Sequence, residues 1–139
     1  MIQPDINLLA VLVAAIATII IGSLWYSPLL FGKIWMRLNG TTQKQMQEAK
    51  KKSMGMLYFI AFITSLVTAY VLAHFMTYVE VTTLSGALQF GFWVWLGFFA
   101  TTQLGMVLWD NKPFKLYLLN TLHYLVSLLV MSMILGLWR

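Results

Sequence analysis

The sequence predicts an all-α integral membrane protein, a transmembrane four-helix bundle with a short interfacial amphipathic helix in its first loop. Three observations predict this fold class. Of the 139 residues, 60% are hydrophobic and only 9% are charged, whereas a soluble domain carries about 25% charged residues. Four apolar runs approach or exceed the length of about 20 residues that crosses a bilayer. Most basic residues lie between these runs. We therefore expect one transmembrane domain over residues 1–139.

The first predicted span covers Ile6 to Tyr26. The residues before it include no basic side chain, whereas a cleavable signal peptide begins with a basic segment. We therefore expect this run to stay in the protein as a helix. It contains no proline that would break the helix.

The segment after the first span predicts a short amphipathic helix. Ser27 and Pro28 are typical of an N-cap and a first helical residue, and Asn39 with Gly40 predicts the end of the helix near residue 39. One predicted face is apolar and should lie in the membrane interface; it carries Leu30, Phe31, Ile34, Trp35 and Leu38. A second, polar helix capped by Thr41 or Thr42 could follow, up to Lys52.

Three further spans are predicted over Met54–Phe75, Leu84–Trp109 and Phe114–Trp138, each without an interior proline. The turn between the third and fourth spans is only about four residues long, so these two helices should pack side by side.

The basic residues predict the orientation in the membrane. Eight of the nine lie in or beside the two loops that connect spans one to two and three to four, and only Arg139 lies on the opposite side. Because basic loops stay in the cytoplasm, both termini should lie outside the cytoplasm. The protein itself should be located in an inner (plasma) membrane. The run Lys50, Lys51 and Lys52 should also attract anionic lipid, so membrane lipids are expected partners.

Small residues recur at spacing four along the spans, which is typical of closely packed membrane helices. These rows could pack the bundle or join protomers of a homo-oligomer, and the sequence leaves both open. The first three rows are Ala10, Ala14, Thr18 and Gly22; Ala61, Ser65, Ala69 and Ala73; and Gly97, Thr101 and Gly105. A shorter row, Ser132 and Gly136, lies on the fourth span.

Composition argues against several functions. The chain has no cysteine, and the interiors of its spans hold no Asp, Glu, Lys or Arg, since Lys115 lies at the very start of the fourth span. Ion-coupled carriers usually keep such a residue at depth. We expect no cofactor, no metal site and no catalytic set, because one buried histidine without a carboxylate partner is a poor catalyst. Nucleic acid is not an expected partner, because the basic residues flank the membrane.

Uncharged polar residues form a predicted layer toward the basic loops. Counted at about 1.5 Å per residue, Ser23, Tyr58, Gln103 and Asn120 lie at one depth, one from each span. His123 and Ser127 continue the polar edge of the fourth helix, and Trp25 with Tyr26 should lie near the mouth of any pocket there. The layer either joins helices through hydrogen bonds or lines a binding pocket in which His123 is the strongest candidate.

Two motifs carry a resemblance to a known family. The stretch from Leu24 through Trp25, Tyr26, Ser27 and Pro28 to Lys33, followed by Trp35, resembles the Domain of Unknown Function 1761 family. The tail from Pro113 and Phe114 through Asn120, His123 and Tyr124 is similar to the same family. The resemblance implies a small bacterial or archaeal membrane protein, and it implies no activity.

Two hypotheses about function follow. In the first, the protein acts without catalysis through helix packing, as a homo-oligomer or a partner subunit. In the second, the polar layer serves a carrier or pore for a small uncharged or lipophilic solute. A membrane enzyme is a third reading, supported only by His123.

Overall fold

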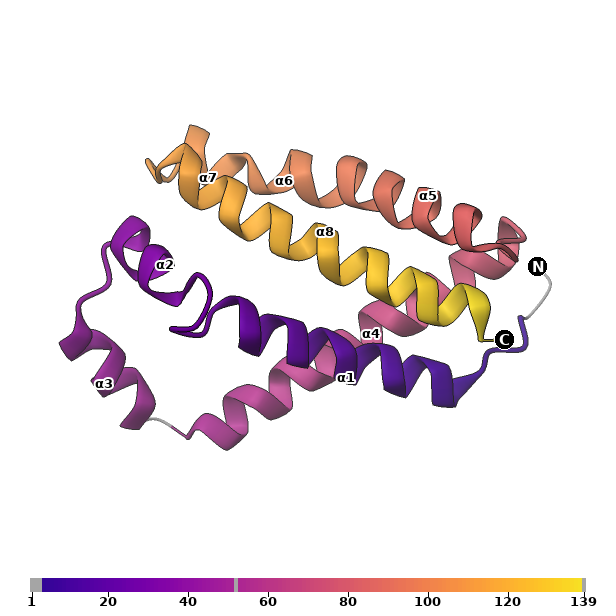
Figure 1. Cartoon of the computed structure of the whole chain (residues 1–139), viewed down its shortest axis with the longest axis horizontal. Coiled ribbons are helices and arrows are strands. Elements are labelled where there is room, and N and C mark those ends of the chain that lie inside the picture. Colours follow the sequence, from indigo (N-terminus) through magenta and orange to yellow (C-terminus); the bar gives the residue numbers. More distant parts are fainter. Residues whose placement is uncertain (1–3, 52, 139) are drawn as a thin grey trace.

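The computed structural model describes residues 4–51 and 53–138. Within those ranges, four helical segments are long and apolar enough to cross a membrane, which confirms the predicted fold class. They are α1 (Leu8–Trp25), α4 (Met54–Tyr78), the segment Leu84–Leu108, and α8 (Phe114–Leu137). Figure 1 shows α8 running between α1 and the third span, with the chain ends at one end of the bundle. We call this end of the bundle the terminal end. The opposite end carries α2 and α3, and we call it the loop end.

The third span is not the unbroken helix that the sequence predicted. It divides into α5 (Leu84–Val94), the π-helical turn η1 (Trp95–Ala100), α6 (Thr101–Gln103) and α7 (Gly105–Leu108). Two hydrogen bonds, one from a side chain of the turn and one from a side chain of α8, join this turn to α8. The indole of Trp95 donates a hydrogen bond to the Thr121 carbonyl at 2.7 Å, and the Tyr117 hydroxyl donates to the Ala100 carbonyl at 2.6 Å.

The predicted amphipathic helix begins later than expected. It is α2 (Gly32–Asn39), and it starts four residues beyond Pro28. Ser27 does not cap it, because the Ser27 hydroxyl donates back to the Leu24 carbonyl at 2.7 Å and so belongs to the end of α1. Its C-terminal end is as predicted, since Gly40 adopts the left-handed conformation with φ 73°.

The second loop helix is α3 (Gln43–Lys51). Of the two caps left open, the structure uses Thr42. Its hydroxyl accepts from the Gln45 amide at 3.1 Å, while the Gln45 side chain accepts from the Thr42 amide at 3.0 Å. These reciprocal bonds form a capping box.

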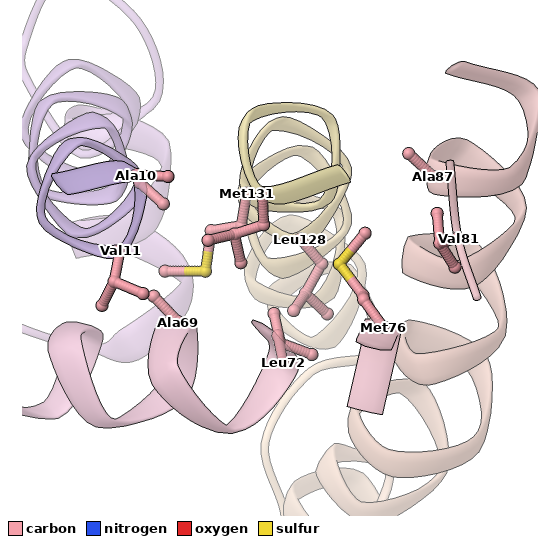
Figure 2. Close-up of a cluster of buried hydrophobic side chains, with 11 residues drawn as sticks. Ala10, Val11, Ala69, Leu72, Met76, Val81, Ala87, Leu128 and Met131 are labelled. Carbon is pink, nitrogen blue, oxygen red and sulfur yellow. The ribbon is translucent and has the colours of Figure 1, made fainter. Parts of the chain in front are cut away.

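The core fills the terminal half of the bundle (Figure 2). Met131 and Leu128 of α8 lie among side chains of α1, α4 and the third span. The small residues Ala10, Ala14 and Ala69 are buried, which lets these helices approach closely. On α8, a Cβ at Gly136 would lie 3.0 Å from the Ala87 Cβ.

The third small-residue row does not pack inside the protomer. A Cβ at Gly97 would meet nothing within 4 Å, Thr101 is exposed, and a Cβ at Gly105 would meet only Trp109. The close contact with α8 uses Gly91 instead, where a Cβ would lie 2.8 Å from Ser132 Oγ and 3.0 Å from the Leu128 carbonyl. Packing between protomers through Gly97 stays a prediction.

The second span, α4, packs against the other helices along only part of its length. Its buried residues, Ala69, Leu72 and Met76, all belong to the half nearer the terminal end. The residues from Met54 to Ile60 are all exposed. Figure 1 shows the first half of α4, which begins at Met54, diverging from α1 and α8 toward α3. The divergence leaves space at the loop end of the bundle.

Candidate functional site

A large cleft occupies the space beside the diverging half of α4. Its volume is about 1070 Å³, at the upper end of the range for small-molecule sites. Its walls come from α1, α4, α6 and α8, and α2 and α3 lie at its rim. We refer to it as the loop-end cleft.

The cleft collects most of the predicted polar layer. Ser23, Tyr26, Tyr58, Gln103, Asn120 and His123 all line it. Trp25 and Ser127 are not among its lining residues. Each of the four spans therefore contributes at least one neutral polar residue to the same cavity.

Tyr26 and Asn120 form the defined polar contact of the site. The Tyr26 hydroxyl donates to Asn120 Oδ1 at 2.8 Å and joins the end of α1 to α8. The amide nitrogen of Asn120 has no hydrogen-bond partner among the described residues.

His123 lies in a ring of aromatic side chains. Its ring centroid is 5.2 Å from that of Tyr26, 5.2 Å from Tyr124 and 6.0 Å from Trp25. The imidazole also packs close to α1 at Gly22, because a Cβ there would lie 3.4 Å from Nε2. Neither ring nitrogen has a hydrogen-bond partner within the part of the chain that the structure describes. His123 therefore does not join helices through hydrogen bonds in this arrangement.

Gln103 reaches the cleft from the end of the π-helical turn. A π turn contains one extra residue, which rotates the following residues by about 100° around the helix axis. Tyr117 and Trp95 fix this turn on α8. Gln103 and Asn120, which the sequence places at one depth, form no hydrogen bond with each other among the described residues, although both line the cleft.

Trp25 and Ser127 lie outside the lining of the cleft. The Trp25 ring packs on Phe31 with a centroid separation of 4.7 Å. Ser127 is buried in α8. The Trp25 indole nitrogen and the Ser127 hydroxyl are buried without a hydrogen-bond partner within the described ranges. Trp25 thus supports the residues at the mouth of the cleft.

Sequence reasoning missed the rim of the cleft. The predicted lipid-facing residue Trp35 instead lines it, with its ring 5.9 Å from that of Tyr26. Ile34, one residue earlier, is exposed as expected. The sequence signal was the amphipathic pattern of α2, whose apolar face can cover protein as well as lipid. Additional rim residues are Lys33, Met36, Gln43, Met46, Gln47 and Lys50.

The site contains the residue types for neutral hydrogen bonding. Asp and Glu are absent from its described lining, and the described residues hold no group of His, Cys, Asp and Glu suited to a metal ion. The other histidine, His74, lies apart on α4, with Nδ1 3.0 Å from the Tyr70 carbonyl.

Comparison with protein families identifies the family of this chain. Residues 9–136 match the family described as "Protein of unknown function (DUF1761)". No curated protein and no solved structure matches the chain. The matched range covers nearly the whole of the four spans and includes every residue that lines the loop-end cleft. The chain belongs to the DUF1761 family.

Proposed function

We propose that this protein is a membrane receptor or carrier that binds a small lipophilic molecule in the loop-end cleft. The observation that carries the proposal is the convergence of neutral polar groups from all four spans on one cavity of about 1070 Å³. A cavity with apolar walls and a few polar groups is the usual form of a small-molecule site. The basic loops favour a cytoplasmic position for this end of the bundle.

The unpaired histidine supports binding over a purely structural role. A residue that only joined helices would use its nitrogens in hydrogen bonds between them. Both nitrogens of His123 lack such a partner among the described residues. Leaving polar groups unpaired in a membrane interior costs several kcal/mol. Both nitrogens are buried, so a hydroxyl or carbonyl group of a bound molecule would offset this cost once the ring turned toward it.

The packed core favours a carrier or receptor over an open pore. Side chains from α1, α4, α8 and the third span fill the terminal half of the bundle. A solute that enters the cleft meets this core, which includes Met76, Met131 and Leu135. Passage to the terminal end would need a rearrangement of the helices.

The experiment tests whether the cleft retains a lipophilic molecule. Native mass spectrometry of the purified protein in detergent should reveal a bound non-protein mass. Ala61 lines the cleft, and Ala61→Trp should fill it and remove that mass. The matched control is Val67→Trp on the same helix, because Val67 is 58% exposed and is not among the lining residues. Equal retention by both variants would contradict the proposal.

Assembly is a second candidate, favoured by the open row on the third span. Gly97 has no neighbour within 4 Å of a Cβ position, and the adjacent side chain of Phe98 is 69% exposed. Small residues on a lipid-facing helix permit a second helix to approach. If this row joins protomers, Gly97→Leu should lower the oligomeric state in mild detergent and leave the monomer folded. An unchanged mass distribution would contradict it.

A further inference from the structure

Two lysines supply all of the formal charge in the described lining of the loop-end cleft. Lys33 comes from α2 and Lys50 from α3, so two separate helices each contribute one lysine to the lining of the same cavity. Neither lysine forms an ion pair with a carboxylate among the described residues. The rim is therefore positively charged, and it is complementary to an anionic group.

The surface beyond the lysines changes in character. Met36, Met46 and Met54 line the rim on α2, α3 and α4, and Ile19 lines the wall on α1. Methionine side chains are flexible and polarizable, so they can pack against chains of variable shape. The cleft thus combines a cationic rim with an adaptable apolar surface, which matches the two parts of an amphipathic anion.

The position of α4 gives such a molecule a route from the bilayer. The first turns of α4 are exposed and diverge from α1 (Figure 1), and Tyr58, which lines the cleft, is itself 49% exposed. A hydrophilic anion from water would match the rim and leave most of the cavity of about 1070 Å³ without a partner. A lipid that moves sideways from the leaflet would occupy both regions.

We propose that the ligand is an acidic lipid whose headgroup binds Lys33 and Lys50 and whose acyl chain enters the loop-end cleft. This inference rests on the proposed function and adds the chemical class of the ligand. Lys51 is on the same helix as Lys50, but it is not among the lining residues. The headgroup is therefore recognised by a defined pair of lysines and not by the basic run as a whole. Lys52 lies outside the described residues.

The test compares two lipids and two matched double variants. The full chain is placed in nanodiscs that contain phosphatidylcholine and phosphatidylglycerol in equal amounts. It is then released into detergent, and the retained lipid is identified by native mass spectrometry. The wild type should retain phosphatidylglycerol over phosphatidylcholine. Lys33→Gln with Lys50→Gln should reduce this preference about tenfold or more, given the usual contribution of two basic residues near a membrane surface.

The control removes the same charge from outside the cleft. Lys44→Gln with Lys51→Gln neutralises two lysines of α3 that do not line the cavity, and should keep the preference for phosphatidylglycerol. Equal loss in both double variants would mean general surface attraction and would overturn the inference. Equal retention of the two lipids, abolished by Ala61→Trp, would overturn the acidic class and leave the proposed function intact. Retention unaffected by Ala61→Trp would contradict both.

Discussion

Gly91 and Gly97 belong to the same span, and their surroundings differ. A side chain at Gly91 would meet the Ser132 hydroxyl at 2.8 Å and the backbone of α8 at 3.0 Å, whereas one at Gly97 would meet nothing within 4 Å. The spacing rule selects Gly97, because it has small partners four and eight residues later. The contact itself depends on which face of the helix is turned toward α8, and spacing alone does not determine that face.

We predict that Gly91→Ala destabilises the bundle and that Gly97→Ala does not. The added methyl group at Gly91 would push α8 away, since the obstructing Leu128 carbonyl is backbone, and overpacking of this kind costs about 1–3 kcal/mol. Gly97→Ala should be neutral or stabilising by up to about 1 kcal/mol, because alanine favours the helix. Thermal unfolding in detergent measures both variants. Equal midpoints for the two would contradict the assignment of the contact to Gly91.

The polar layer shows which part of a site can be read from single residues. Depth counting along the spans placed Ser23, Tyr58, Gln103 and Asn120 at one level, and in the structure all four line the loop-end cleft. It could not identify the partners within that cavity. Tyr26 bonds to Asn120, and Gln103 does not, because hydrogen bonds depend on rotations of a few tens of degrees that hydropathy does not encode.

At the scale of helices, the π-helical turn is the main departure from the predicted fold. Trp95 to Ala100 contains no proline, so no residue in the sequence marked the irregularity. Its cause is tertiary. Hydrogen bonds from the Trp95 indole to the Thr121 carbonyl of α8 and from the Tyr117 hydroxyl of α8 to the Ala100 carbonyl join the two ends of the turn to α8. The same bonds fix the rotation that directs Gln103 toward the cleft.

We predict that Tyr117→Phe destabilises the third span. The change removes the 2.6 Å bond to the Ala100 carbonyl and should cost about 1 kcal/mol. The control is Tyr70→Phe on α4, because the Tyr70 side chain is 45% exposed and its hydroxyl has no hydrogen-bond partner among the described residues. Thermal unfolding in detergent compares them. If both variants have the same unfolding midpoint as the wild type, Tyr117 does not hold the π-helical turn.

The helix α2 shows a second limit of reading elements from sequence. Its end was predictable, because Gly40 is suited to the left-handed conformation at a helix C-terminus. Its beginning was not, because Ser27 and Pro28 also suit the turn that follows α1. This turn brings the backbone at Gly32 so close to the Tyr26 carbonyl that a Cβ there would lie 2.5 Å from it, which only glycine permits. An amphipathic pattern predicted the helix, and only the structure gives its start.

On the scale of the whole molecule, the bundle is packed at one end and open at the other. The long apolar runs were enough to predict four spans and a helical bundle. They could not predict the divergence of α4, because the apolar residues of its exposed half are equally suited to contact with protein and with lipid. The loop-end cleft is a consequence of this divergence, which explains why its polar residues were predictable and its shape was not.

We predict that both chain ends lie outside the cytoplasm. Four spans return the chain to its starting side, and the basic residues near α2 and α3 favour a cytoplasmic loop end. A reporter that is active only in the cytoplasm should be silent when fused to either end and active when inserted after Gly40. Activity at both ends would reverse the orientation. Activity at one end alone would contradict an even number of spans.

The two ends of the described chain also meet. Asn7 Nδ2 donates to the Trp138 carbonyl at 3.4 Å, so the start of α1 and the end of α8 are neighbours at the terminal end. A short glycine-serine linker could therefore join them without crossing the bilayer. If the chain were then opened at the turn around Asn111, the circular permutant would keep every span in place and begin and end at the loop end. The geometry of the bundle thus does not require the order in which its helices are synthesised.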